Sequence, residues 1–279
     1  MSAGALTGAT AATYAPRAMS ASAVAFALDG PVARITLNRP EVLNAGDPGW
    51  VAELNAVVEA VAAEAARGAL RVAVIGGAGR AFCTGVDLKA LARGAMTLPH
   101  FVAWEDAMTA IERLPVPFIA AINGHCLGGG LQLALVCDYR LAAASATIGL
   151  PAVKECLIPS MALYRLPRLI GAARASELIL TGEPISAARA EALGLVHRVV
   201  PAADFSRTVE EAVARFLALP ATAVAWSKRL MARAFDLDFD AFRREMEAGL
   251  RECLDSAEHQ AAMDEIRTGL ARRSAKRSG

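Results

Sequence analysis

Four apolar, strand-like stretches recur before Pro201, and a helix-like stretch separates each of them from the next. The strand-like stretches are PVARITLNRP (31–40), LRVAVIGG (70–77), FIAAING (118–124) and YRLAAA (139–144). Apolar residues follow helical spacing from Trp50 to Arg67, from Phe101 to Leu114, and onward from about Gly129. Crossovers of that length return the chain in the same direction. The sequence therefore predicts an α/β core with largely parallel pairing, opened by an edge hairpin.

The chain after Pro201 is predicted to be helical. Helical spacing extends over DFSRTVEEAVARFLALP (204–220), with Asp204 as the expected N-cap, and again over 223–234 and 239–266. Short helices with broad apolar faces need a partner surface, so we expect this region to help build an oligomer. The expected organisation is a disordered tail over 1–22, a core over 23–202 and a helical region over 203–279.

Composition narrows the class of protein. The chain has 279 residues, of which 55% are hydrophobic, and 29 basic residues face 28 acidic ones, so no basic surplus favours nucleic acid as a partner. No apolar run reaches the roughly 18 residues that a membrane span needs. The five cysteines lack C-x-x-C spacing and lie in mostly apolar surroundings, which predicts buried free thiols, no metal site and a cytoplasmic location.

Two glycine-rich loops lead from an expected strand into an expected helix. They are GGAGRAFCTGVDLKAL (76–91) and FIAAINGHCLGGGLQLAL (118–135). A helix entrance carries unpaired N–H groups, and glycine lets a ligand oxygen approach them closely. Two such donors on one oxygen would form an oxyanion hole.

Two other interpretations of these glycine-rich loops are open: the glycines only permit tight turns, or the loops form a nucleotide site. GGAGRAF lacks the third glycine of G-x-G-x-x-G, and no P-loop, G-x-S-x-G or H-E-x-x-H motif occurs.

Several motifs in a fixed order resemble those of the crotonase, or enoyl-CoA hydratase/isomerase, superfamily. They are ITLNRPEVLNA, GAGRAFCTGVDLKAL, AAINGHCLGGGLQLALVCDYRLAAASATIGLP and LTGEPISAARAEALGLVHRVVP, and the match covers about Val24 to Pro201. The resemblance implies a crotonase-like spiral of strand-strand-helix units with a helical C-terminal trimerisation region, assembled as a homotrimer or homohexamer.

The resemblance also implies an acyl-CoA thioester as ligand. Coenzyme A is then part of the substrate, and no separate cofactor is expected. Carried onto this chain, the two oxyanion donors are the backbone N–H groups of Val86 and Gly129. The residues that would hold the rest of the substrate are Arg80, Thr84, Gly85, Asp87, Leu88 and Gly128. For Asp87, capping of the following helix is the favoured role over proton transfer.

The chain departs from the family pattern at both glutamates that handle water and the α-proton in hydratases. Gln132 aligns with the first and Ala152 with the second, and an amide does not accept a proton near neutral pH as a carboxylate does. Glu155, one turn beyond Ala152, is a candidate replacement, although an exposed charge beside Lys154 is the favoured interpretation.

Other residues are weaker candidates for the missing chemistry. Ser160 stands where some relatives carry a catalytic aspartate, and it would need a base to become a nucleophile. His125 is better explained by packing, and Tyr164, Cys156 and Cys126 are weaker still.

Three classes of function remain open from the sequence. The first is an acyl-CoA enzyme working through a thioester enolate, whether by hydration, isomerisation, decarboxylation or carbon–carbon bond hydrolysis. The second is a non-catalytic acyl-CoA-binding subunit, and the third is an NAD enzyme on a generic α/β core. We expect the acyl pocket to be formed by residues 91–104 and the C-terminal helices. Within 91–104, the sequence does not decide whether Met96, Leu98 and Trp104 belong to the core or face the ligand.

Overall fold

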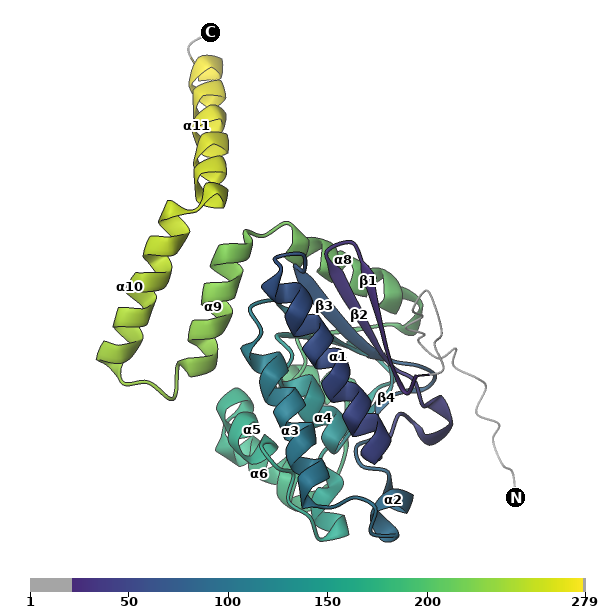
Figure 1. The fold of residues 1–279 in the computed structure, drawn as a ribbon. Helices are drawn as coiled ribbons and strands as arrows, with labels where there is room; N and C mark the ends of the chain where they lie inside the picture. Colours follow the sequence, from purple (N-terminus) through teal and green to yellow (C-terminus); the bar gives the residue numbers. More distant parts are fainter. Residues whose placement is uncertain (1–21, 278–279) are drawn as a thin grey trace.

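The computed structural model describes residues 22–277, with side chains to residue 268, and places them in two sheets surrounded by helices (Figure 1). The predicted tail over 1–22 lies outside these residues except for Ser22. The six-stranded sheet has the order β1 (Val24–Asp29), β2 (Val32–Leu37), β3 (Val72–Gly77), β5 (Phe118–Ile122), β7 (Tyr139–Ala143), β10 (Arg198–Val200). The four-stranded sheet has the order β4 (Ala81–Cys83), β6 (His125–Leu127), β8 (Thr147–Gly149), β9 (Ile185–Ser186).

The chain alternates between the two sheets, and this alternation produces the expected spiral. β3, β5 and β7 each lie in the larger sheet, and the next strand of each, β4, β6 or β8, lies in the smaller one. Helices follow each pair of strands before the chain returns. β1 and β2 form the predicted antiparallel edge hairpin, and the pairs β2–β3, β3–β5, β5–β7 and β7–β10 are parallel. The α/β fold class is therefore confirmed.

The helices of the core have the following bounds: α1 (Pro48–Ala66), α2 (Leu88–Ala92), α3 (Leu98–Arg113), α4 (Gly129–Leu135), α5 (Ala162–Ile170), α6 (Ala172–Thr181), α7 (Ala187–Ala192) and α8 (Phe205–Leu217). Three short 3-10 turns, η1 (Pro40–Val42), η2 (Pro151–Glu155) and η3 (Ala202–Asp204), connect elements.

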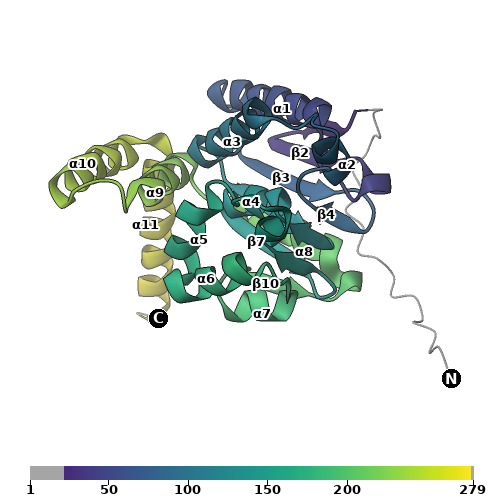
Figure 2. The ribbon, with the colours of Figure 1, turned by 90° about the horizontal axis from the view of Figure 1, so that it is seen from below.

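Side chains alternate between the two faces of the larger sheet, and each face has its own helical cover. On one face Ile35 and Leu37 join the main core with residues of α1 and α3. On the other face Val72 and Val74 pack with Phe205 of α8 in a second, smaller cluster. Figure 2 shows α1 and α3 on one side of β2 and β3, and α8 on the other. The continuous apolar runs that predicted buried strands are thus explained by burial on both faces.

Of the C-terminal helices, α9 (Ala221–Arg233) lies beside the body of the molecule, and α10 (Phe239–Asp255) and α11 (Ala257–Arg277) extend away from it (Figure 1). One expectation for this region was wrong, and another holds only in part. The stretch 239–266 is two helices, because Ser256 is extended (φ −72°, ψ 148°) and its hydroxyl accepts from His259 N. Asp204 is the N-cap residue of α8, as expected, but its side chain makes no cap bond and its carboxylate pairs instead with Arg207 at 2.7 Å.

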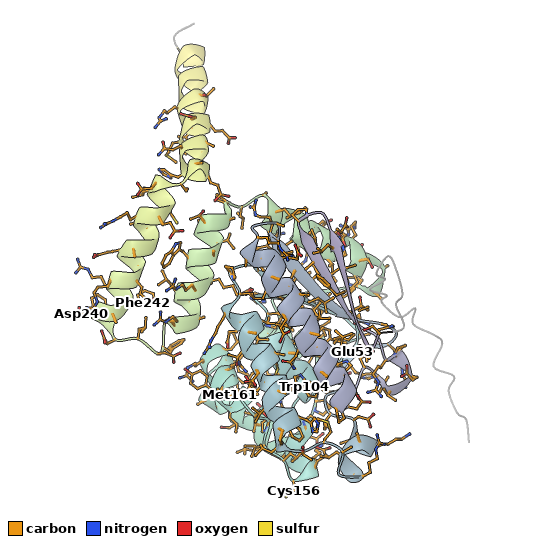
Figure 3. All side chains as sticks on the ribbon, in the orientation of Figure 1. Glu53, Trp104, Cys156, Met161, Asp240 and Phe242 are labelled. Carbon is orange, nitrogen blue, oxygen red and sulfur yellow. The ribbon has the colours of Figure 1, made fainter. Side chains whose placement is uncertain are left out.

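All five cysteines are free, as predicted, but they are not all buried. Cys83, Cys126 and Cys137 are buried, and burial raises the pKa of the Cys83 and Cys137 thiols to about 12 and that of Cys126 well above its ordinary value. Cys156 is exposed at the edge of the body, because it follows η2 on the surface (Figure 3), and Cys253 on α10 is half-buried. Within residues 22–277 no helix is both long enough and apolar enough to span a bilayer.

Candidate active site

One cavity of about 620 Å³ gathers the predicted site residues from three separate parts of the chain. Every predicted residue except Gly85 lines it: Arg80, Thr84, Val86, Asp87, Leu88, Gly128, Gly129, Gln132, Ala152, Glu155 and Ser160. They come from the segment 80–88 on both sides of β4, the entrance of α4, and the segment around η2. The two sheets therefore bring distant loops together at one end of the spiral.

The first glycine loop is held in an extended conformation beside the segment 43–46. Gly46 N donates to Gly85 O (2.8 Å) and Asp87 N donates to Gly46 O (2.9 Å), so Gly46 and Val86 form a parallel bridge. In such a bridge the N–H of the paired residue faces away from the partner strand. The N–H of Val86 therefore points away from Gly46, and among the described residues it has no acceptor.

Gly85 brings the two loops into contact. Its φ of +90° lies in the region that L side chains rarely adopt, and a Cβ built on it would lie 2.8 Å from Gly129 N. That Cβ position is about 3 Å from Val86 N by covalent geometry, so the nitrogens of Val86 and Gly129 lie at most roughly 6 Å apart. One oxygen between them can accept from both.

Gly129 begins α4, so its N–H has no acceptor within the helix. The indole of Trp104, from α3, packs directly on it, and a Cβ on Gly129 would lie 2.8 Å from that ring. Gly129 therefore has to be glycine for the indole to form this wall of the cavity.

The structure shows which of Met96, Leu98 and Trp104 belong to the core and which line the cavity. Trp104 is both core and cavity wall, with 3% of its surface exposed. Met96 is buried and does not line the cavity, while Leu98 is 75% exposed. Phe101 and Met108 of α3 also line it, whereas the described residues of α9–α11 do not.

Asp87 caps α2, as predicted. One carboxylate oxygen accepts from Lys89 N (2.9 Å) and Ala90 N (3.1 Å), and the other lies 3.5 Å from the guanidinium of Arg39. This carboxylate is engaged on both oxygens, which leaves Glu155 and Glu41 as the other acidic residues lining the cavity.

Glu41, on η1, and Lys89, on α2, were not predicted from the sequence. Glu41 lies within the quoted motif NRPEVLNA, but nothing in its spacing indicates that η1 lies beside the loop after β4. The signal that could have identified it is the motif itself, since a charged residue in a short loop segment of this kind is more often functional than one in a core element.

Gln132 is buried, with 8% of its surface exposed, and its Oε1 has no donor among the described residues. Ala152 lies across the cavity on η2. Neither position holds a carboxylate.

Of the weaker candidates, Ser160 lines the cavity, and its backbone has an unusual φ of +37°. His125, Cys126, Cys156 and Tyr164 do not line it.

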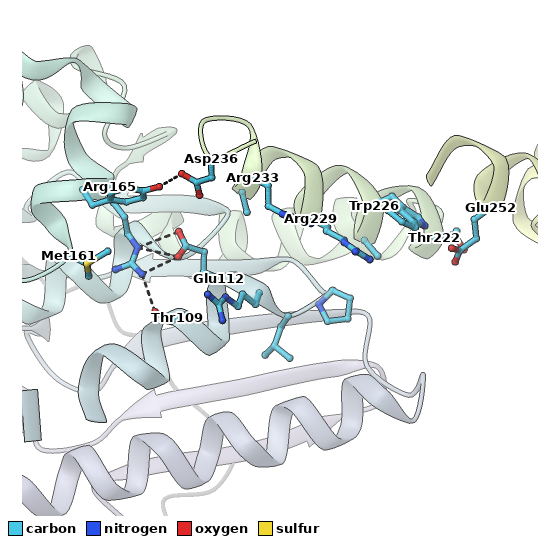
Figure 4. A pocket seen from close by; sticks show the side chains of 16 residues that line it. Thr109, Glu112, Met161, Arg165, Thr222, Trp226, Arg229, Arg233, Asp236 and Glu252 are labelled. Atoms are coloured by element: carbon cyan, nitrogen blue, oxygen red, sulfur yellow. Dashed lines mark hydrogen bonds and ion pairs between the residues drawn. The ribbon is translucent and has the colours of Figure 1, made fainter. Parts of the chain in front are cut away.

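A larger cavity of about 820 Å³ lies between α3, α5 and α9 (Figure 4). It holds the ion pairs of Arg165 with Glu105 (2.7 Å) and Glu112 (3.0 Å), and the hydroxyl of Tyr164 donates to Asp236. It has neither glycine-rich helix entrance nor unpaired backbone donors from such a loop. The smaller cavity is therefore the better candidate for chemistry.

Comparison with known proteins shows the family. Residues 28–272 match the enoyl-CoA hydratase/isomerase family. A probable enoyl-CoA hydratase of Mycobacterium tuberculosis is 37% identical over 213 residues, which cover 75% of this chain and 80% of the relative. The (E)-benzylidenesuccinyl-CoA hydratase of Thauera aromatica is 38% identical over 208 residues, covering 68% and 76%.

Solved structures show the same fold. The enoyl-CoA hydratase of Bacillus anthracis superposes with a TM-score of 0.81 at 32% identity, covering 88% of this chain and 96% of that one. The enoyl-CoA hydratase of Mycobacterium smegmatis gives 0.81 at 30% identity, covering 89% and 96%. With its sequence, its spiral of two sheets and its pair of glycine-rich helix entrances in agreement, this chain belongs to the enoyl-CoA hydratase/isomerase family.

Proposed function

We propose that the cavity binds an acyl-CoA thioester and stabilises its enolate between the backbone N–H groups of Val86 and Gly129. The observation that carries this proposal is the contact of the two glycine loops at Gly85, which leaves both nitrogens close together and without a described acceptor. The relatives named as enoyl-CoA and benzylidenesuccinyl-CoA hydratases support the substrate class.

The proposed donors act through electrostatics. Negative charge grows on the thioester oxygen as the α-proton leaves, and fixed N–H groups stabilise that charge without reorganising. Loss of one such donor typically costs about 3 to 4 kcal/mol of transition-state stabilisation. Trp104, Phe101 and Met108 exclude water from one side of the cavity, which strengthens the interaction.

We assign proton transfer to Glu155. It lies on η2 with Ala152 and lines the cavity; the residue is exposed, as the sequence favoured, and the amine of the neighbouring Lys154 pairs with Glu183 at 2.6 Å. A carboxylate at Glu155 replaces the two that are absent at Gln132 and Ala152. Gln132 then serves as a neutral hydrogen-bonding group for the substrate.

Exchange of the α-protons of butyryl-CoA in D₂O, followed by NMR, tests this function without knowledge of the complete reaction. We expect exchange with wild-type protein and its loss by at least about 100-fold in Glu155→Gln, with binding retained. Failure to bind butyryl-CoA, crotonyl-CoA and malonyl-CoA in calorimetry would refute the proposal.

A second candidate function is a non-catalytic acyl-CoA-binding subunit, favoured by the absence of carboxylates at 132 and 152. The double variant Gln132→Glu/Ala152→Glu separates the two. Hydration of crotonyl-CoA by the double variant, with no proton exchange or turnover by wild-type protein, would favour the binding subunit.

We also propose that the C-terminal helices assemble the chain into a trimer or a hexamer. Phe235, Phe239 and Leu250 are 71%, 78% and 54% exposed, and together with Met231 and Leu254 they give α9, the turn after it and α10 an apolar surface. Such a surface favours burial against another subunit.

A further inference from the structure

The guanidinium of Arg39 lies between two aspartates that each cap a helix, Asp47 at α1 and Asp87 at α2. Its Nη2 is 3.1 Å from Asp47 Oδ2 and 3.5 Å from Asp87 Oδ2, and its Nη1 donates to Ala45 O at 2.7 Å. Asp47 caps α1 by accepting from Trp50 N at 2.9 Å. Each aspartate therefore uses one oxygen for a helix entrance and the other for Arg39.

The segment that Arg39 holds is the one that pairs with the first glycine loop. Thr84 N donates to Leu43 O (3.2 Å), Gly46 N to Gly85 O (2.8 Å) and Asp87 N to Gly46 O (2.9 Å). These three bonds fix the peptides on both sides of Val86. Arg39 contacts this ladder from both strands, through Ala45 and Asp47 on one and Asp87 on the other.

The segment 43–46 has a backbone conformation that non-glycine residues do not favour. Leu43 and Asn44 have φ values of +58° and +59°, which non-glycine residues rarely adopt. Asn44 is fully buried; it accepts from Arg39 N at 2.8 Å and donates to the carbonyls of Ala81 and Phe82. A strained turn of this kind persists only where its surroundings fix it.

We infer that Arg39 is a positioning residue that orients the N–H of Val86 toward the oxyanion site. This inference rests on the function proposed above, and it goes beyond it by assigning a role to a residue that does not line the cavity. The planar guanidinium reaches two carboxylates through Nη2 and a carbonyl through Nη1, a geometry that lysine does not reproduce. Arg39 thus couples the entrance of α1 to that of α2 and holds the loop between them.

Infrared spectroscopy of bound crotonyl-CoA, labelled with ¹³C at the thioester carbonyl, tests the inference. Hydrogen bonds to the carbonyl oxygen lower its stretching frequency, so the frequency reports whether the donors are aligned. We expect wild-type protein to lower it and Arg39→Met to lose most of that shift. In the proton-exchange assay, the exchange rate of the same variant should fall roughly 30- to 100-fold, while its Kd for butyryl-CoA changes less than about threefold. Arg39→Lys should recover only part of the shift.

The matched control is Arg207→Met. Arg207 also lies between two carboxylates at a helix entrance, Asp204 and Glu211, but on the surface of α8. It should leave the carbonyl frequency unchanged. If Arg39→Met does not fold, Asp47→Asn keeps the cap of α1 and removes one ion pair, and it should give an intermediate frequency.

The outcomes separate the two proposals. A wild-type protein that binds crotonyl-CoA without shifting its carbonyl frequency contradicts the oxyanion site itself. A wild-type shift that persists in full in Arg39→Met and in Asp47→Asn overturns the role of Arg39 alone.

Discussion

Gly85 is the residue on which the geometry of the candidate site depends most. It combines a positive φ with a position where a single added methyl group would lie 2.8 Å from Gly129 N and 3.1 Å from Leu127 O. The backbone there has no room to move without separating the two loops. A substitution at this position therefore acts on the site by displacing a donor.

We predict that Gly85→Ala loses roughly 100-fold or more of the proton-exchange rate, because the new Cβ displaces the Gly129 amide. The control is Gly68→Ala, where φ is +71° but nothing lies within 4 Å of the added Cβ. Both variants carry backbone strain of about 1 kcal/mol, and only Gly85→Ala should lose activity. Equal activity in the two variants would contradict the proposed donor geometry.

A second residue-scale prediction concerns His197, which accepts from Arg140 N at 3.1 Å and stacks on Tyr139. Partial burial, together with the charge of Arg140, lowers the pKa of His197 to about 4. Between pH 6.5 and 4 the unfolded chain therefore binds a proton that the folded protein does not. The contribution of His197 to stability is complete above about pH 6.5 and declines as the pH falls toward 4.

The variant His197→Phe keeps a ring against Tyr139 and removes this titration. Urea unfolding at pH 7 and pH 5 should show a smaller loss of stability in the variant than in wild-type protein. Identical losses in the two proteins would show that His197 is not the titrating group.

At the scale of elements, a single buried lysine joins the C-terminal helices to the core. Lys228 on α9 is 5% exposed; its amine lies 2.8 Å from Asp138 Oδ2 and donates to the carbonyls of Ile111 and Val116 at 3.2 and 2.9 Å. The amine thus connects α9 to the end of α3 and to the segments that lead into β5 and β7. The amine has an acceptor for each of its three N–H groups.

We expect Lys228→Met to lower the free energy of unfolding by on the order of 3 kcal/mol, because Asp138 would lose its ion-pair partner at a partly buried site. Lys154→Met is the control, since the pair of Lys154 with Glu183 is 45% and 71% exposed and should matter by less than about 1 kcal/mol. Urea denaturation measures both. A loss in Lys228→Met no larger than in the control would contradict this role.

The sequence predicted the long elements well and the short ones poorly. The apolar periods at 50–67 and 101–114 correspond to α1 and α3, which begin two and three residues earlier, because each has a proline in its first turn. Strands β4, β6 and β8 have three residues each, too few to show a period, and Ser256 interrupts the last predicted helix without a proline or glycine.

The residues of the candidate site likewise fall into those that the sequence predicted and those that it did not. Loops that carry several glycines are visible in a sequence, and their residues do line one cavity. Glu41 and the bracing role of Arg39 depend on the packing of η1 against a loop some forty residues away. Such a pairing has no local signature.

At the scale of the whole molecule, the arm formed by α9–α11 carries apolar surface outward from the body (Figure 1). Leu250 and Leu254 are one turn apart on α10 and are 54% and 48% exposed. We predict that the double variant Leu250→Glu/Leu254→Glu lowers the trimeric or hexameric mass of the wild-type protein in light scattering, because charges resist burial at an interface. An unchanged trimeric mass in the variant, or a monomeric wild-type protein, would contradict the assignment.

The most direct test of the oxyanion site is a crystal structure of the protein with a non-hydrolysable acyl-CoA analogue. We predict that the oxygen corresponding to the thioester carbonyl lies about 2.7 to 3.1 Å from both Val86 N and Gly129 N. An analogue oxygen that contacts neither nitrogen, or that is held by Gln132 while the two amides face elsewhere, would contradict the account.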